Sequence, residues 1–245
     1  MMDTELWAIA GFLGLPSDWS CFGLEQCRAF APEDFDSAQL PFLGLMDWAE
    51  HFNLHFQAQG KKPGVLMGYS LGGRLALHTL IQNPSLWRAA IIISAHPGLV
   101  AESERLARQQ LDNDWAARFE KEDWASLMFS WNQRSTFSCG HFQFERQEKD
   151  YCRQRLAASL RGWSLGVQRD LRQELSQLDL PIYWMVGERD ETYCKLMQEV
   201  ELNHPLSKKI ILPQAGHRAP WEQPAQFRLF CHELLFQTNF TLENQ

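Results

Sequence analysis

The sequence predicts an α/β fold in which a mostly parallel sheet is covered by helices on both faces. Short apolar runs without polar alternation recur along the chain, which is typical of strands buried on both sides. Segments with the apolar spacing of helices separate these runs, as crossovers between parallel strands require. With 245 residues, 45% of them hydrophobic, the chain is long enough for one large domain or two small ones.

The apolar runs predict five strands along the chain. The fragment RAAIIIS is richest in the β-branched residues that favour strands, and LWAIAGFL and GVLMGYS precede it. The strands are predicted at 6–13, 64–70, 88–94, 180–188 and 207–214.

Helices are predicted between these strands and after the last one. The segment 44–59 ends at Gly60, and the segment 71–83 is stopped at Asn83-Pro84, because the residue before proline disfavours the helical conformation. A third helix, 224–236, closes the core.

A long charged and amphipathic stretch interrupts the alternation. No strand-like run occurs between about residue 99 and the strand at 180–188. We therefore expect a helical lid at 99–175 inserted into a core formed by 1–98 and 176–245.

Composition limits the class of protein and its partners. The formal net charge of −7 and the lack of a basic stretch argue against nucleic acid, and no apolar run reaches the length of a membrane span. The start, MMDTELWAIAGF, lacks the basic segment of a signal peptide. Six scattered cysteines without a CxxC pair indicate free thiols, and we expect a cytoplasmic protein without a metal site.

The strongest motif is GYSLG, residues 68–72, between a predicted strand and a predicted helix. The glycines allow strand and helix to approach closely, and Ser70 would sit on a strained turn with its hydroxyl out of the sheet. The alternative is an ordinary helix cap. The strand and helix on either side favour a nucleophile or base at Ser70.

A serine of this kind needs an imidazole, which in turn needs a carboxylate. Asp190 and His217 each follow a different predicted strand, at the edge where Ser70 is also expected. Glu188 or Asp150 remain alternatives for the acid. His96 and His141 are candidates for lining the same pocket.

These residues resemble the α/β-hydrolase superfamily. The fragment AGFLG stands where that superfamily has its oxyanion loop, which implies that the backbone N–H groups of Phe12 and Leu71 form an oxyanion hole. Ala10 replaces the usual histidine of the loop. The chain opens almost directly on this strand, so we expect the superfamily's first hairpin to be missing and the sheet to have about six strands.

A narrower resemblance rests on GFLG with Trp19, GYSLGGR, SAHPGL and VGERD…AGH. Together they resemble the 2-succinyl-6-hydroxy-2,4-cyclohexadiene-1-carboxylate (SHCHC) synthases of menaquinone biosynthesis. That resemblance implies a lyase that expels pyruvate from a polyanionic cyclohexene, with the serine as base. It also implies substrate contacts from the side chains of Arg74, Arg108, Trp131, Tyr69 and either Arg155 or Arg153.

Arg74 carries the expected specificity for a polycarboxylate. It lies one helical turn past Ser70 on the same face, and a guanidinium presents a donor fork to a carboxylate. The alternative is an arginine that extends to the surface. Likewise, lid arginines can be solvated, Trp131 can belong to a lid core, and Tyr69 can simply pack.

Two other functions remain open. The same triad serves a serine carboxylesterase or thioesterase, such as the pimeloyl carrier-protein methyl ester esterase of biotin synthesis. A non-catalytic binding protein of the same fold is the third possibility, against which the complete set of Ser, Asp and His argues. No metal or organic cofactor is implied, because proton transfer and oxyanion stabilisation need only side chains and amides.

Overall fold

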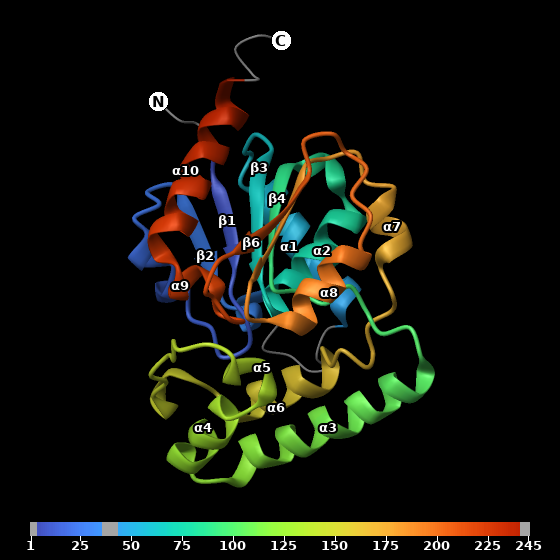
Figure 1. The fold of residues 1–245 in the computed structure, drawn as a ribbon. Coiled ribbons are helices and arrows are strands. Elements are labelled where there is room, and N and C mark those ends of the chain that lie inside the picture. The colour runs from blue at the N-terminus through green and yellow to red at the C-terminus, as the bar shows by residue number, and fades with distance from the viewer. Residues whose placement is uncertain (1–3, 36–43, 241–245) are drawn as a thin grey trace.

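A computed structural model describes residues 4–35 and 44–240, and for 236–240 the backbone only (Figure 1). The described residues form a six-stranded sheet in the order β2-β1-β3-β4-β5-β6, with every neighbouring pair parallel. The strands are β1 (Leu6–Ile9), β2 (Cys27–Phe30), β3 (Gly64–Tyr69), β4 (Trp87–Ile93), β5 (Ile182–Gly187) and β6 (Lys208–Leu212). The predicted α/β fold is confirmed.

Strand β2 was not among the predicted strands. Its four residues, CRAF, include a charged side chain and lie at the edge of the sheet, where none of them is fully buried. The segment therefore contains no continuous apolar run from which a strand could be predicted. The first strand was predicted too long, because β1 ends at Ile9 and the chain turns there toward the site.

Successive side chains of each strand face opposite layers of helices. Trp7 and Ile9 of β1 pack on the face covered by α1 (Leu45–Ala58) and α2 (Leu71–Gln82). Leu6 and Ala8 belong to the other face, where α10 (Pro224–Phe240) and the 3-10 helix η1 (Pro16–Phe22) lie. Burial on both faces explains why the strands are continuous apolar runs.

The helices between residues 102 and 162 gather beyond one end of the sheet, at the bottom of Figure 1. They share a small hydrophobic cluster that includes Trp115, Phe119, Leu156 and Leu160, and Leu13 from the loop after β1 belongs to it as well. These helices are α3 (Glu102–Lys121), α4 (Trp124–Asn132), α5 (Ser135–Ser138), the 3-10 helix η4 (Glu148–Asp150) and α6 (Arg153–Gly162).

The chain after α6 returns to the sheet. Trp163, Leu171 and Leu175 pack in the cluster with α1 and α2, and α7 (Arg172–Ser176) leads into β5. The division into a lid at 99–175 and a core stays a prediction, and the predicted core includes residues 1–3, 36–43 and 241–245, which lie outside the described residues. The remaining elements are η2 (Pro32–Phe35), η3 (Pro84–Leu86), α8 (Glu191–Glu199) and α9 (Ala219–Glu222).

Two simple properties accompany this fold. All six cysteines are free thiols. Among the helices that the structure describes, none combines the length and apolar character needed to span a bilayer.

His78, on the buried face of α2, is expected to make the fold less stable in acid. Burial, followed by the charge of Arg74, lowers the pKa of His78 from 6.5 to about 3. The unfolded chain therefore takes up the proton first, and stability is lost as the pH falls below 6.5. Between pH 7 and pH 5 this residue should cost about 2 kcal/mol of unfolding free energy.

Urea unfolding at the two pH values measures this effect, with His78→Leu as the comparison. The variant should lose less stability than the original chain on going to pH 5. Equal losses in both proteins would show that His78 does not titrate as described.

Candidate active site

Ser70 lies on a sharp turn between β3 and α2. Its backbone has φ 53° and ψ −112°, a conformation that residues with a Cβ rarely adopt. The N–H of Arg74 donates to the Ser70 carbonyl at 3.1 Å, so the helix begins directly after the turn. This turn presents the serine at the carboxyl edge of the sheet.

Two glycines permit the turn. A Cβ at Gly68 would overlap the backbone of Gly72, and a Cβ at Gly72 would overlap the carbonyl oxygens of Ile9 and Ala10. The start of α2 therefore lies in contact with the ends of β1 and β3. Only residues without a side chain fit at these two positions.

Ser70, His217 and Asp190 are brought together from three loops. His217 Nε2 lies 3.1 Å from Ser70 Oγ, and His217 Nδ1 lies 2.7 Å from Asp190 Oδ2. Asp190 also caps α8, accepting the N–H of Tyr193 at 3.5 Å. The imidazole and the carboxylate are almost fully buried, at 1% and 4% exposure. The hydrogen-bond chain has the geometry of a serine activated by a carboxylate-oriented histidine.

The other candidates for acid and histidine lie elsewhere. Glu188 accepts the N–H of Gln214 at 2.8 Å, and Asp150 is exposed in η4. His96 lines the cavity, where burial, followed by the charge of Arg74, lowers its pKa to about 3. His141 is on the outside and contacts Glu222.

The two amides expected to hold an oxyanion flank the serine. Phe12 and Leu71 both line the cavity that contains Ser70 and His217. Within the described part of the chain, neither backbone N–H donates a hydrogen bond. Both donors are therefore available to a ligand.

Arg74 reaches into the same cavity and is only 7% exposed, so it does not extend to the surface. Its Nε donates to Gln168 Oε1 at 2.5 Å, and Gln168 donates in turn to the carbonyl of His96 at 3.0 Å. Among the described residues its Nη2 has no partner. Burial, followed by the charge of Arg108, lowers the pKa of Arg74 to about 9, which leaves it charged at neutral pH.

Arg108 and Trp131 come from the lid helices and also line the cavity. Arg108 Nε lies 2.9 Å from both carboxylate oxygens of Asp112, and Asp112 accepts the hydroxyl of Ser164 at 2.7 Å. Trp131 is buried against Phe12, with ring centroids 4.9 Å apart. It therefore belongs to the lid core and to the cavity wall at once.

Neither Arg153 nor Arg155 is among the residues that line the cavity. Arg153 pairs with Glu148 at 2.6 Å and donates to the carbonyl of Glu122, and Arg155 is half-buried on the same helix, α6. The arginine that does line the cavity from this part of the chain is Arg134, which the sequence analysis missed. Its position three residues after Trp131 was the one available signal.

Comparison with known proteins decides the family. A model described as "Alpha/beta hydrolase family" matches residues 11–228. The chain belongs to the alpha/beta hydrolase family. Both predicted resemblances are confirmed, because proteins named 2-succinyl-6-hydroxy-2,4-cyclohexadiene-1-carboxylate synthase are among the relatives of this hydrolase-fold chain.

The relatives match over most of their length. The Salmonella arizonae synthase is 36% identical over 226 residues, covering 88% of this chain and 87% of the relative. The Citrobacter koseri synthase is 33% identical with the same coverage. Among solved structures, MenH from S. aureus has a TM-score of 0.80 at 19% identity, covering 96% of this chain and 94% of that one. A malate-bound esterase from Thermogutta terrifontis has a TM-score of 0.71 at 18% identity, covering 96% and 90%.

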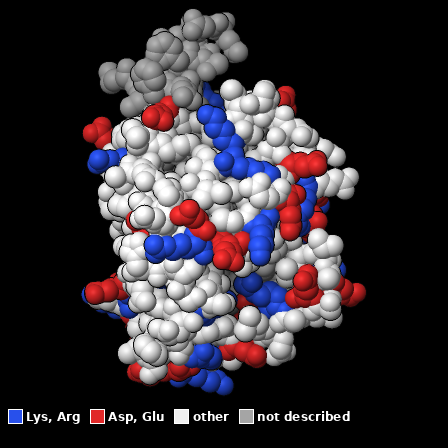
Figure 2. Space-filling model, viewed as in Figure 1, with Lys and Arg blue, Asp and Glu red and all other residues white. Residues whose placement is uncertain are grey.

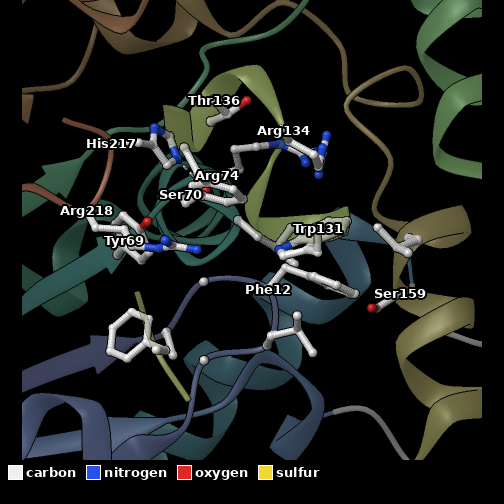
Figure 3. A pocket seen from close by; sticks show the side chains of 18 of the residues that line it. Phe12, Tyr69, Ser70, Arg74, Trp131, Arg134, Thr136, Ser159, His217 and Arg218 are labelled. Carbon is white, nitrogen blue, oxygen red and sulfur yellow. Dashed lines mark hydrogen bonds between the residues drawn. The ribbon is translucent and has the colours of Figure 1, made fainter. Parts of the chain in front are cut away.

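Tyr69 and Arg218 form the wall of the hydrolase cavity beside the histidine. The rings of Tyr69 and His217 lie 5.6 Å apart, and Figure 3 shows Tyr69 next to Arg218. Burial raises the pKa of the Tyr69 phenol, so it stays protonated and able to donate. Arg218 donates to the carbonyl of Phe142 and to Asn132 Oδ1, which ties the histidine loop to the lid.

Among the described residues no cluster of His, Cys, Asp or Glu could hold a metal ion.

Gly72→Ala tests the close approach that shapes the serine turn. The added Cβ overlaps backbone carbonyls that cannot rotate away, so we expect a loss of about 1–3 kcal/mol in unfolding free energy. Gly23→Ala is the control, because its positive φ of 60° is strained but no atom lies within 4 Å of the added Cβ. That variant should lose about 1–2 kcal/mol from the backbone alone.

The second readout is the reactivity of Ser70 with a fluorophosphonate. Gly72→Ala should abolish labelling and Gly23→Ala should leave it unchanged. Normal labelling of a stable Gly72→Ala protein would show that the contact is not needed.

Proposed function

We propose that this chain is a lyase that converts 2-succinyl-5-enolpyruvyl-6-hydroxy-3-cyclohexene-1-carboxylate to SHCHC and pyruvate in menaquinone biosynthesis. The observation that carries the proposal is the cationic cavity around Ser70 and His217. Five arginines and two aspartates line it within the described residues: Arg74, Arg108, Arg134, Arg146, Arg218, Asp18 and Asp112.

The charge of this cavity contrasts with that of the whole chain. The protein carries a formal net charge of −7, and on the face shown in Figure 2 basic and acidic side chains are interspersed. Buried arginines are costly unless an anion compensates them. A substrate with three carboxylates supplies that compensation, whereas a simple ester does not. The relatives with 33% and 36% identity are named as synthases of SHCHC, the product of the proposed reaction.

The proposed reaction begins with proton transfer within the triad. Ser70 Oγ gives its proton to His217 Nε2, while Asp190 accepts the hydrogen bond from Nδ1–H and stabilises the imidazolium. The serine oxygen then takes the α-proton of the substrate ring. The electron pair of that C–H bond, at C2, forms a C2=C3 double bond. The existing ring double bond moves from C3=C4 to C4=C5 as the C5–O bond to the enolpyruvyl group breaks.

The remaining groups balance charge and protons. The departing pyruvate enolate takes the proton from His217 and tautomerises to pyruvate, which returns the triad to its starting state. The amides of Phe12 and Leu71 would hold the enolate oxygen that develops when the α-proton leaves. Arg74, one turn from Ser70, would bind a carboxylate near the reacting carbon.

A serine ester hydrolase is the second candidate. The free amides of Phe12 and Leu71 beside Ser70 would suit an acyl intermediate equally well. It differs from the lyase in forming an acyl-serine, so rapid p-nitrophenyl ester turnover would favour it.

The first test is pyruvate release from the proposed substrate by the purified protein. A lactate dehydrogenase-coupled assay should show turnover, and Ser70→Ala should lower kcat by at least about 10³-fold, as removal of a triad member does elsewhere. Thermal unfolding should be unchanged in that variant. No pyruvate from the folded, unmodified protein, together with fast ester cleavage, would replace the lyase by the hydrolase.

Arg74→Met separates function from stability. Removing a buried cation with an unpartnered nitrogen should leave unfolding free energy equal or raise it by about 1 kcal/mol. The loss of a charge-assisted carboxylate contact should lower kcat/KM by about 10–100-fold. Unchanged kcat/KM in a stable variant would remove Arg74 from the substrate site.

A further inference from the structure

Arg134 lies on the lid side of the cavity, where its guanidinium contacts the rings of two tryptophans. Its guanidinium is 4.2 Å from the ring centre of Trp131 and 5.4 Å from that of Trp115. Figure 3 shows Arg134 and Trp131 together on one side of the cavity, with His217 and Tyr69 on the other. Stacking of this kind restricts the guanidinium to one plane and leaves its N–H edges free to donate.

The N–H groups of Arg134 are unused. Within residues 4–35 and 44–240, its side chain makes no hydrogen bond and no ion pair. Two other lid arginines that stack on tryptophan are neutralised: Arg118 pairs with Glu122 at 2.6 Å and Arg153 pairs with Glu148 at 2.6 Å. Arg134 thus differs from its neighbours in lining the cavity and in lacking an acid.

The charges around Arg134 favour the binding of an anion. Burial, followed by the positive charge of Arg108, lowers the pKa of Arg134 to about 10, and Arg108 acts on Arg74 in the same sense. Asp112, the carboxylate nearby, is already engaged by Arg108 and Ser164. Arg108 therefore repels both Arg74 and Arg134, Asp112 offsets part of this repulsion, and a bound negative group would offset more of it.

We propose that Arg134 binds a substrate carboxylate remote from the reacting carbon and fills the role that the sequence analysis assigned to Arg155 or Arg153. The proposal rests on the proposed lyase function. Arg74 follows Ser70 by one turn and serves the reacting end, whereas Arg134 comes from the lid. A contact to a remote carboxylate acts equally on the bound substrate and on the transition state, so its loss raises KM more than it lowers kcat.

The test compares Arg134→Gln with Arg118→Gln. Arg118 stacks on the same Trp115 but is paired and does not line the cavity, so its variant controls for lost stacking. In the pyruvate-release assay, Arg134→Gln should raise KM by about 10–100-fold with kcat within about threefold. Arg118→Gln should leave both constants near those of the original protein, and Arg134→Lys should recover part of the affinity.

A binding measurement keeps the result independent of the lyase assay. Glutarate, a simple dicarboxylate, should bind the original protein in calorimetry and bind Arg134→Gln at least about tenfold more weakly. If Arg134→Gln is unstable, Arg134→Met keeps the apolar packing against the tryptophans and should show the same loss.

The outcomes distinguish the two proposals. No pyruvate release by the original protein, with glutarate binding still dependent on Arg134, would refute the lyase and retain an anion site. Pyruvate release with equal KM values in Arg134→Gln and Arg118→Gln would overturn the role of Arg134 and retain the lyase.

Discussion

The contact of the first turn of α2 with the ends of β1 and β3 is the constraint on which the site depends. Because Gly68 and Gly72 allow backbone to touch backbone there, Ser70 is forced into its positive-φ turn. The same contact sets the direction of α2, and hence places Arg74 one turn further along the cavity wall. A serine hydroxyl, an amide pair and a cation are thus positioned by one packing contact, without any flexible loop.

The arginines of the cavity around this turn lower the stability of the fold. Arg74 is buried with one nitrogen unpartnered, and Arg134 is half-buried against tryptophans without an acid. The chain offsets part of this cost by fixing each cation with neutral groups: Gln168 holds Arg74 and aromatic faces hold Arg134. Neutral partners keep each guanidinium in position but leave its charge for the ligand, whereas an acidic partner would cancel it. Two other arginines that line the cavity do have acidic partners: Arg108 pairs with Asp112 and Arg146 with Asp18. Arg74 and Arg134 therefore leave more charge for a ligand than these two do.

The sequence predicted those features that follow from strand order and close packing. Ser70, Asp190 and His217 could be assigned because parallel strands place their carboxyl ends at one edge, whatever the distance along the chain. Strand β2 could not be predicted, because this four-residue strand at the edge of the sheet has no apolar run. Arg134 lies in the turn between α4 and α5, and spacing along the sequence does not specify where such a turn places a side chain. For that reason Arg134 was not predicted to line the cavity, whereas Arg155 or Arg153 was.

The loop that carries His217 is joined directly to residues of the predicted lid. Glu222, a buried carboxylate, accepts the N–H of Gly216 at 2.9 Å and that of His141 in the lid at 3.4 Å. A Cβ on Gly216 would lie 2.8 Å from the Cα of Gly140, so the two backbones are in contact. Arg218 adds bonds to Phe142 and Asn132 on the other side of His217. Displacement of residues 139–142 would therefore shift the imidazole away from Ser70.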